Sequence, residues 1–169
     1  KYFFIPIQLT LITTFTIGTP SFILALEPNT DLVKGKFLLK VVSRALPTSL
    51  TVLFNVILVT CFTMAFNLSY EMQSSLSVYL TAITGLIYLY KICKPFTIIR
   101  GTLFTVMLIG FLFCITREYA FFNLIKLKPT SILIIFVLAL DSLYVYKRLN
   151  YFITKAFHKL DPTIEVETI

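Results

Sequence analysis

The chain has 169 residues, of which 57% are hydrophobic and 14% are charged, and its formal net charge is +7. Soluble domains contain about 45–50% apolar residues, so this composition, with a mean hydropathy of +0.88, excludes an ordinary water-soluble domain. No segment combines the positive charge with a recognisable nucleic-acid-binding module, so no nucleic-acid partner is expected.

A helix needs about 20 mostly apolar residues to span a bilayer, because lipid offers no hydrogen-bond partners to the backbone. Five segments meet this requirement, the third and fourth with the help of flanking residues: 4–26, 46–66, 76–90, 102–115 and 131–146. We therefore expect one all-α domain over residues 1–169, a polytopic transmembrane bundle of about five helices embedded in a lipid bilayer.

The first apolar segment combines polar side chains with a helix breaker. Pro20 has no N–H to donate to the carbonyl of Thr16, and its ring pushes the preceding turn open. Gly18 lowers the cost of unwinding the same turn. We expect a broken helix here, in which Thr16 presents a hydroxyl and an unpaired carbonyl.

Oxygen atoms at such a break can replace the water shell of a hard cation. Thr13 and Thr16 are the first candidate cation ligands, and Thr10 and Thr14 are possible further ligands on nearby faces. The same threonines can instead bond their own i−4 carbonyls or a neighbouring helix. The residues by themselves leave both interpretations open.

Residues 31–45, between the first two spans, show helical periodicity. Apolar residues such as Leu38 and Val42 gather on one side, and Lys36, Lys40 and Arg44 form a stripe at i, i+4 spacing on another. This pattern predicts a basic interfacial helix lying on the membrane surface, although an ordinary solvated face carries the same charges.

Two polar residues of the later spans are candidate site residues. Asn55, in the second span, is expected to hydrogen-bond a neighbouring helix rather than to bind an ion. Asp141, in the last span, is a candidate functional carboxylate, because charges inside membranes are costly. Lys147 and Arg148 lie close enough in the sequence for a structural ion pair with Asp141 instead.

The residues that most often perform catalysis or bind metals have no suggestive arrangement. Cys61, Cys93 and Cys114 have no CxxC spacing and no His neighbour, and are expected to be small buried hydrophobes. His158 stands alone near the end of the chain, so no catalytic residue is predicted.

Lysine and arginine fall unevenly on the connecting segments. Eleven of the 15 lie in the first connector, the third connector and the tail, which share one side, and four lie on the other. Because positively charged segments are retained on the cytoplasmic side, we expect a multi-pass protein of the plasma membrane with a cytoplasmic C-terminus.

In the first span, six residues stand at spacings that form a motif: Pro6, Gln8, Leu9, Thr16, Gly18 and Pro20. This arrangement resembles the sixth transmembrane helix of P-type cation-transporting ATPases, whose pattern is similar to P-x-Q-L-x-x-x-N-x-x-T-D-G-x-P. The run from Thr16 to Asn29 looks like that of a bacterial branch associated with calcium or magnesium transport. Five spans followed by a cytoplasmic tail resemble helices six to ten of that fold.

The resemblance implies the C-terminal membrane portion of an ATP-driven pump that transports Ca²⁺ or Mg²⁺. Thr13 stands where the family has a site asparagine, Thr16 matches a site threonine, and Ile17 replaces a site aspartate. Without that carboxylate, the site has less negative charge for a divalent ion. Other helices then supply the acids, or fewer ions are carried, or the selectivity differs.

The Asp-Lys-Thr-Gly-Thr motif that ATP phosphorylates in such pumps is absent from the chain. The resemblance therefore assigns ATP and its Mg²⁺ to cytoplasmic domains outside it, and makes those domains and the remaining helices its partners. An apolar span that begins almost at Lys1 also indicates a piece of a longer protein.

The alternative is a self-contained small membrane protein, either a channel or an assembly scaffold. A membrane-bound lipid enzyme ranks last, because no apolar span contains a paired histidine and acid.

Overall fold

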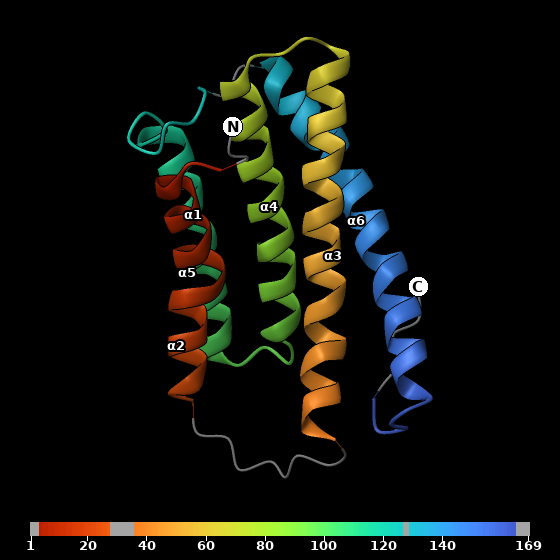
Figure 1. The fold of residues 1–169 in the computed structure, drawn as a ribbon. Helices are drawn as coiled ribbons and strands as arrows, with labels where there is room; N and C mark the ends of the chain where they lie inside the picture. The colour runs from red at the N-terminus through yellow and green to blue at the C-terminus, as the bar shows by residue number, and fades with distance from the viewer. Residues whose placement is uncertain (1–3, 28–35, 127–128, 165–169) are drawn as a thin grey trace.

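The computed structural model of the chain describes residues 4–27, 36–126 and 129–164, and all of its regular elements there are helices. They are α1 (Pro6–Thr13), the π-helical turn η1 (Thr14–Gly18), α2 (Thr19–Ala25), α3 (Phe37–Ala65), α4 (Tyr70–Ile92), α5 (Ile98–Arg117) and α6 (Pro129–His158). Figure 1 shows α1, η1 and α2 as one continuous rod, called the first rod below, with α5 beside it. The all-α bundle expected from the sequence is confirmed.

Within the described ranges, four helical rods are long and apolar enough to cross a membrane: residues 6–25, α3, α4 and α5. The helix α6 has 30 residues and contains the fifth predicted span, 131–146, but it is not among these four. Asp141 is the one charged residue within 131–146, and Lys147 and Arg148 follow directly after this segment.

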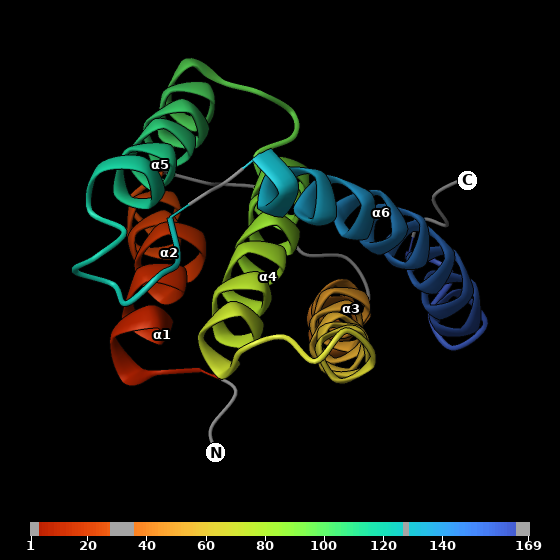
Figure 2. The ribbon, with the colours of Figure 1, turned by 90° about the horizontal axis from the view of Figure 1, so that it is seen from above.

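The helix α4 is the centre of the bundle. Over an apolar stretch of 18 residues in each spanning rod, 56% of the residues are buried in α4, against 28% in the first rod and 22% in both α3 and α5. Figure 2 shows α4 between the first rod on one side and α3 and α6 on the other, and these neighbours contact it. Small residues such as Ser74, Ser77 and Ala82 permit this close approach.

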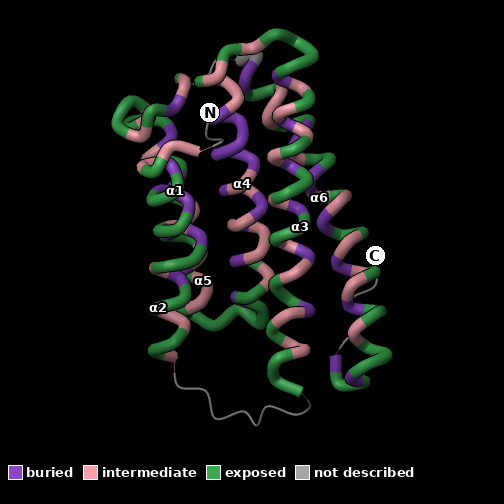
Figure 3. Tube along the Cα trace, in the orientation of Figure 1, coloured by how far each residue is buried: buried purple, intermediate pink, exposed green. Residues whose placement is uncertain are grey.

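The outward faces of the other rods remain exposed, as the green bands of Figure 3 show. They carry large apolar side chains, among them Phe22, Leu53 and Ile109, each more than half exposed. Such a continuous apolar exterior is what a lipid environment requires. Cys93 is buried as expected, but Cys61 lies on this exterior and Cys114 is half-buried, and all three thiols are free.

The basic interfacial helix expected over 31–45 is not a separate element where the structure describes it. Residues 37–45 form the first turns of α3, which continues through the buried Pro47 to Ala65. The earlier part of that prediction, residues 31–35, lies outside the described residues. The sequence does not reveal that one helix continues through Pro47, because proline is as typical of the first turn of a helix as of a kink within one.

Two predicted spans are longer than expected because polar caps precede them. Ser69 Oγ accepts a hydrogen bond from the backbone N–H of Met72 at 3.3 Å, and α4 begins at Tyr70 rather than at residue 76. Thr97 Oγ1 accepts one from Arg100 at 3.3 Å, and α5 begins at Ile98 rather than at residue 102. Each hydroxyl satisfies a free amide of the first helical turn.

The start of α3, the α4–α5 turn and the end of α6 lie at one end of the bundle (Figure 1). The backbone N–H of Lys36 donates to Asp161 Oδ2 at 2.7 Å, which ties the start of α3 to the segment after α6. Arg100 Nε and Glu27 Oε2 form an ion pair at 2.7 Å between the start of α5 and the residues after α2. We call this the basic end, after its cationic residues Lys36, Lys40, Arg44, Lys91, Lys94 and Arg100.

Candidate cation site

The predicted helix break is a π-helical turn rather than an unwound segment. In η1 the backbone N–H of Thr19 donates to the carbonyl of Thr14, five residues earlier. The buried Pro20 follows directly and lies in the first turn of α2. Because Pro20 has no N–H, the regular α-helical pairing cannot pass it, and the wider turn carries the rod past this point without opening it. The prediction of a broken helix is corrected in this respect.

Three of the four candidate threonines bond to their own helix. The hydroxyls of Thr16, Thr13 and Thr10 each donate to the carbonyl four residues earlier, at 2.8, 2.8 and 3.2 Å. This is the alternative that the sequence left open, and it describes their hydrogen bonding in this structure. A hydroxyl that donates its proton keeps lone pairs on oxygen, so the same atoms retain the capacity to bind a cation.

The candidate threonines do not all face the same way. Thr16 is buried against α4, where an idealised Cβ on Gly85 would lie 2.7 Å from its Cγ2 atom. Thr10, Thr13 and Thr14 are exposed, as is Ile17. No other part of the chain that the structure describes covers that side of the rod. We call it the open face, defined by Thr10, Thr13, Thr14 and Ile17.

Hydroxyl groups line α4 inside the bundle. Ser74 Oγ donates to Gln8 Oε1 at 2.7 Å, which fixes the start of the first rod to α4. Further along, Ser77 Oγ and Thr81 Oγ1 are buried and have no hydrogen-bond partner among the described residues. Thr81 precedes Gly85 by one helical turn and therefore shares the face that meets Thr16. These serines and threonines are not among the site residues predicted from the sequence, although they recur along one apolar span.

A second polar group joins α3, α4 and α6. Asn55 Nδ2 donates to Thr84 Oγ1 at 2.9 Å and to Ser142 Oγ at 3.0 Å, and all three side chains are buried. The two hydroxyl oxygens lie 3.2 Å apart. Asn55 is thus an interhelical hydrogen-bond donor, as expected, and its Oδ1 atom has no partner within the described residues.

The carboxylates do not gather at the π-turn. Asp141 is exposed on α6, and no ion pair to Lys147 or Arg148 is present among the described residues. Glu27 is engaged by Arg100 at the basic end. Over the described ranges, no three His, Cys, Asp or Glu side chains come together as a metal site would require. The described residues therefore offer hydroxyl and carbonyl oxygens at the π-turn, but no carboxylate cage.

Comparisons with known proteins identify relatives among cation transporters. The chain is 39% identical over 109 residues to exp7 of Streptococcus pneumoniae, described as a probable cation-transporting ATPase, a match covering 64% of this chain and 14% of that protein. It is 47% identical over 49 residues to the calcium-transporting ATPase CtpE of Mycolicibacterium smegmatis, covering 29% of this chain and 6% of that protein. No protein-family model matches the chain. No solved structure matches it either.

The chain thus spans less than two thirds of the length of these curated relatives. The similarity supports the interpretation of this chain as a fragment of a P-type ATPase and does not favour a self-contained small membrane protein.

Proposed function

We propose that this chain is a membrane segment of an ATP-driven cation pump and that its first rod forms one wall of the ion path. The observation that carries the proposal is the π-turn of residues 14–18, next to which Thr10, Thr13 and Thr14 lie on the open face, in a chain similar to two cation-transporting ATPases. Such turns inside α-helices are frequent at functional sites.

The open face supplies part of a coordination shell. Thr13 offers a hydroxyl oxygen there, and the carbonyls near the widened turn offer others. Hard cations such as Ca²⁺ take about six to eight oxygen ligands, including carboxylates. Because Ile17 has no oxygen on its side chain, we propose that helices outside this chain pack on the open face and contribute the acids.

Calcium is the first choice of transported ion, and magnesium the second. The name of the mycobacterial relative, a calcium-transporting ATPase, favours Ca²⁺. Ca²⁺ also tolerates irregular sets of neutral oxygens, whereas Mg²⁺ demands a near-ideal octahedron at shorter distances. A face of hydroxyls and carbonyls fits the first ion better.

The rest of the bundle serves as support for the first rod. Gln8 and Thr16 attach the rod to α4, and Asn55 attaches α4 to α3 and α6. In the proposed cycle, phosphorylation of cytoplasmic domains outside this chain moves helices against this supporting bundle and switches access to the ion. The basic end then faces the cytoplasm of a bacterial cell.

The test is ATP-driven uptake of Ca²⁺ into inverted membrane vesicles that contain the full-length protein. Replacing Thr13 with Ala should raise the Ca²⁺ concentration for half-maximal uptake several-fold, because an oxygen ligand is lost. Thr105→Ala is a matched control, since Thr105 is also exposed and bonds its own i−4 carbonyl, at 2.9 Å, but lies on α5.

Two results would count against the proposal. Absence of ATP-driven uptake of Ca²⁺ or Mg²⁺ by the unmodified full-length protein would contradict the pump itself. Uptake with an unchanged Ca²⁺ affinity in Thr13→Ala would retain the pump but remove the open face from the ion path.

A further inference from the structure

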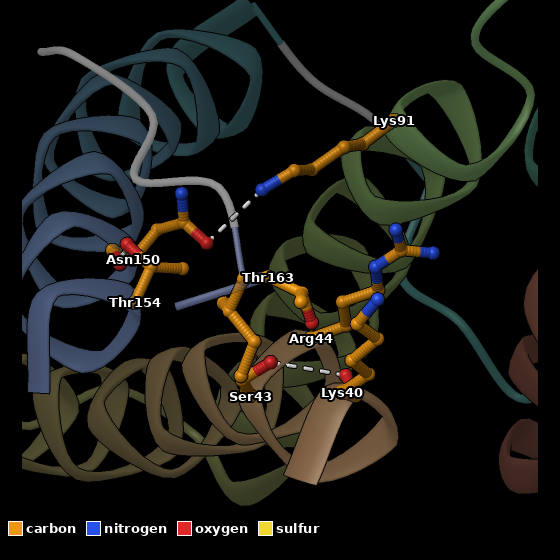
Figure 4. A pocket seen from close by; sticks show the side chains of 8 residues that line it. Lys40, Ser43, Arg44, Lys91, Asn150, Thr154 and Thr163 are labelled. Carbon is orange, nitrogen blue, oxygen red and sulfur yellow. Dashed lines mark hydrogen bonds between the residues drawn. The ribbon is translucent and has the colours of Figure 1, made fainter. Parts of the chain in front are cut away.

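A pocket of about 260 Å³ lies at the basic end, between α3, α4, α6 and the segment that follows α6. Figure 4 shows Lys40 and Arg44 side by side on α3, with Lys91 reaching in from α4. Asn150 and Thr154 of α6 form the opposite wall. None of the lining side chains is a carboxylate, so the lining is cationic and hydroxyl-rich.

The wall formed by α4 and α6 is held in place by its own contacts. Lys91 Nζ donates to Asn150 Oδ1 at 3.0 Å and lies 5.8 Å from the centroid of the Tyr146 ring. Thr154 Oγ1 donates to the carbonyl of Asn150 at 2.6 Å, and both side chains are more than nine-tenths buried. This wall is therefore preformed.

Among the described residues, the carboxylate of Asp161, two residues before the lining residue Thr163, only partly offsets the positive charge. Its Oδ2 accepts from the backbone N–H of Lys36 at 2.7 Å, and its Oδ1 accepts from the backbone and hydroxyl of Thr163. It also interacts electrostatically with Lys40. With this charge counted against those of Lys40, Arg44 and Lys91, the described residues give the pocket an excess of two positive charges.

We infer that this pocket binds an anionic phosphate group, supplied by a phospholipid headgroup of the adjoining leaflet. An arginine fork matches the oxygens of a phosphate and lysines add point charges, which is the usual chemistry of such sites. The cavity is smaller than a pocket for a drug-sized ligand, at about 300–1,000 Å³, and suits a headgroup phosphate. The inference does not depend on the proposed transport function.

A second groove next to the pocket argues for a lipid rather than for free phosphate. This groove, of about 650 Å³, shares Arg44 and Lys91 with the pocket and continues along Ile92, Pro95 and Phe96. Apolar side chains directly beside a cationic pocket match a molecule with a charged head and an acyl tail. The site also lies at the end of the spanning helices that the positive charge predicts to be cytoplasmic, where anionic lipids concentrate.

The experiment uses the full-length protein reconstituted in phosphatidylcholine vesicles with and without phosphatidylglycerol, followed by native mass spectrometry of the lipid retained. The pocket variant combines Lys40→Gln with Arg44→Gln. The control combines Arg148→Gln with Lys155→Gln, which removes the same amount of charge from the C-terminal half of α6, at two residues that do not line the pocket. Thermal unfolding in phosphatidylcholine alone checks that both variants fold.

The unmodified protein and the control should retain phosphatidylglycerol, and the pocket variant should bind it at least about tenfold more weakly, because each basic residue contributes to the attraction. Arg44→Lys, which keeps the charge but loses the fork, should bind more weakly than the unmodified protein and more tightly than the pocket variant. Equal loss in the pocket variant and the control, or no preference for phosphatidylglycerol, would overturn the inference. Protection from thermal unfolding by inorganic phosphate in detergent, without lipid retention, would overturn the lipid assignment.

Discussion

Gly85 of α4 and Thr16 of the π-turn meet so closely that an idealised Cβ on Gly85 would lie 2.8 Å from Thr16 Cβ and 2.7 Å from its Cγ2. The Thr16 side chain cannot easily rotate away, because its hydroxyl donates to the carbonyl of Ile12 at 2.8 Å. This contact fixes the position of the first rod against the centre of the bundle.

Gly85→Ala should therefore separate the first rod from α4. We expect a loss of about 1–3 kcal/mol of stability, typical of overpacking a well-packed site. Gly101→Ala is the control, because no atom outside its chain neighbours and its own helix backbone lies within 4 Å of the added Cβ, and alanine favours helix. Thermal unfolding of both variants in the full-length protein is monitored by the reaction of a thiol probe with the buried Cys93. Equal unfolding temperatures would show that the rod is not held at this contact.

The Asn55 group should behave as one coupled unit. Asn55→Ala removes two interhelical hydrogen bonds, to Thr84 and to Ser142, and should cost about 1–2 kcal/mol. Ser142→Ala should cost less, because Asn55 still reaches Thr84. A double-mutant cycle on these two positions should give a coupling energy of about 0.6–1.7 kcal/mol. Strict additivity would mean that the interhelical hydrogen bond contributes nothing.

Asp161 should give the basic end an acid-sensitive contact. Hydrogen bonds from the backbone of Lys36, and then from the side chain and backbone of Thr163, lower the pKa of the Asp161 carboxyl from 3.8 to about 2. Because the folded-state pKa lies below the unfolded value, the stabilisation is present above pH 3.8 and is lost as the pH falls through 2. Hydrogen exchange at the Lys36 amide should accelerate over that window, relative to amides within α3. In Asp161→Asn this step should vanish, and a step that persists there would refute the assignment.

Pro20→Ala tests whether the π-turn itself matters. The alanine supplies the missing N–H, so η1 can return to a regular α-helix, which turns Thr13 relative to α2. Cation stimulation of ATP hydrolysis by the full-length protein should weaken by several-fold, with ATP affinity unchanged. Pro129→Ala, at the first position of α6, provides a proline substitution away from the turn. Unchanged cation affinity in Pro20→Ala would exclude the turn from the ion site.

The helices could be predicted from the sequence because lipid imposes one rule on every span: a long apolar segment with satisfied backbone. The same rule explains why the special character of residues 14–20 was visible, since Pro20 removes a donor whatever the surroundings. The form of the distortion was not visible. A widened turn and an unwound segment have the same sequence signature, and the packing of Thr16 against Gly85 is a long-range contact.

The hydrogen-bond partners of the polar side chains could not be predicted from the nearby sequence either. Asn55 could be assigned to another helix, but nothing near it in the sequence identifies Ser142 as a partner. The pairing of Gln8 with Ser74 also joins residues far apart in the chain. The continuity of α3 through Pro47 depends on neighbours that bury this proline.

The central claim, that the chain belongs to a cation pump, is tested most directly by phosphorylation of the full-length protein by ATP in the presence of Ca²⁺, Mg²⁺, Mn²⁺ or K⁺ in turn. We predict an acid-stable phosphoenzyme whose level responds to one transported cation, with Ca²⁺ the strongest, once the Mg²⁺ needed by ATP is held constant. A phosphoenzyme level independent of every cation tested, or no phosphoenzyme at all, would contradict the account.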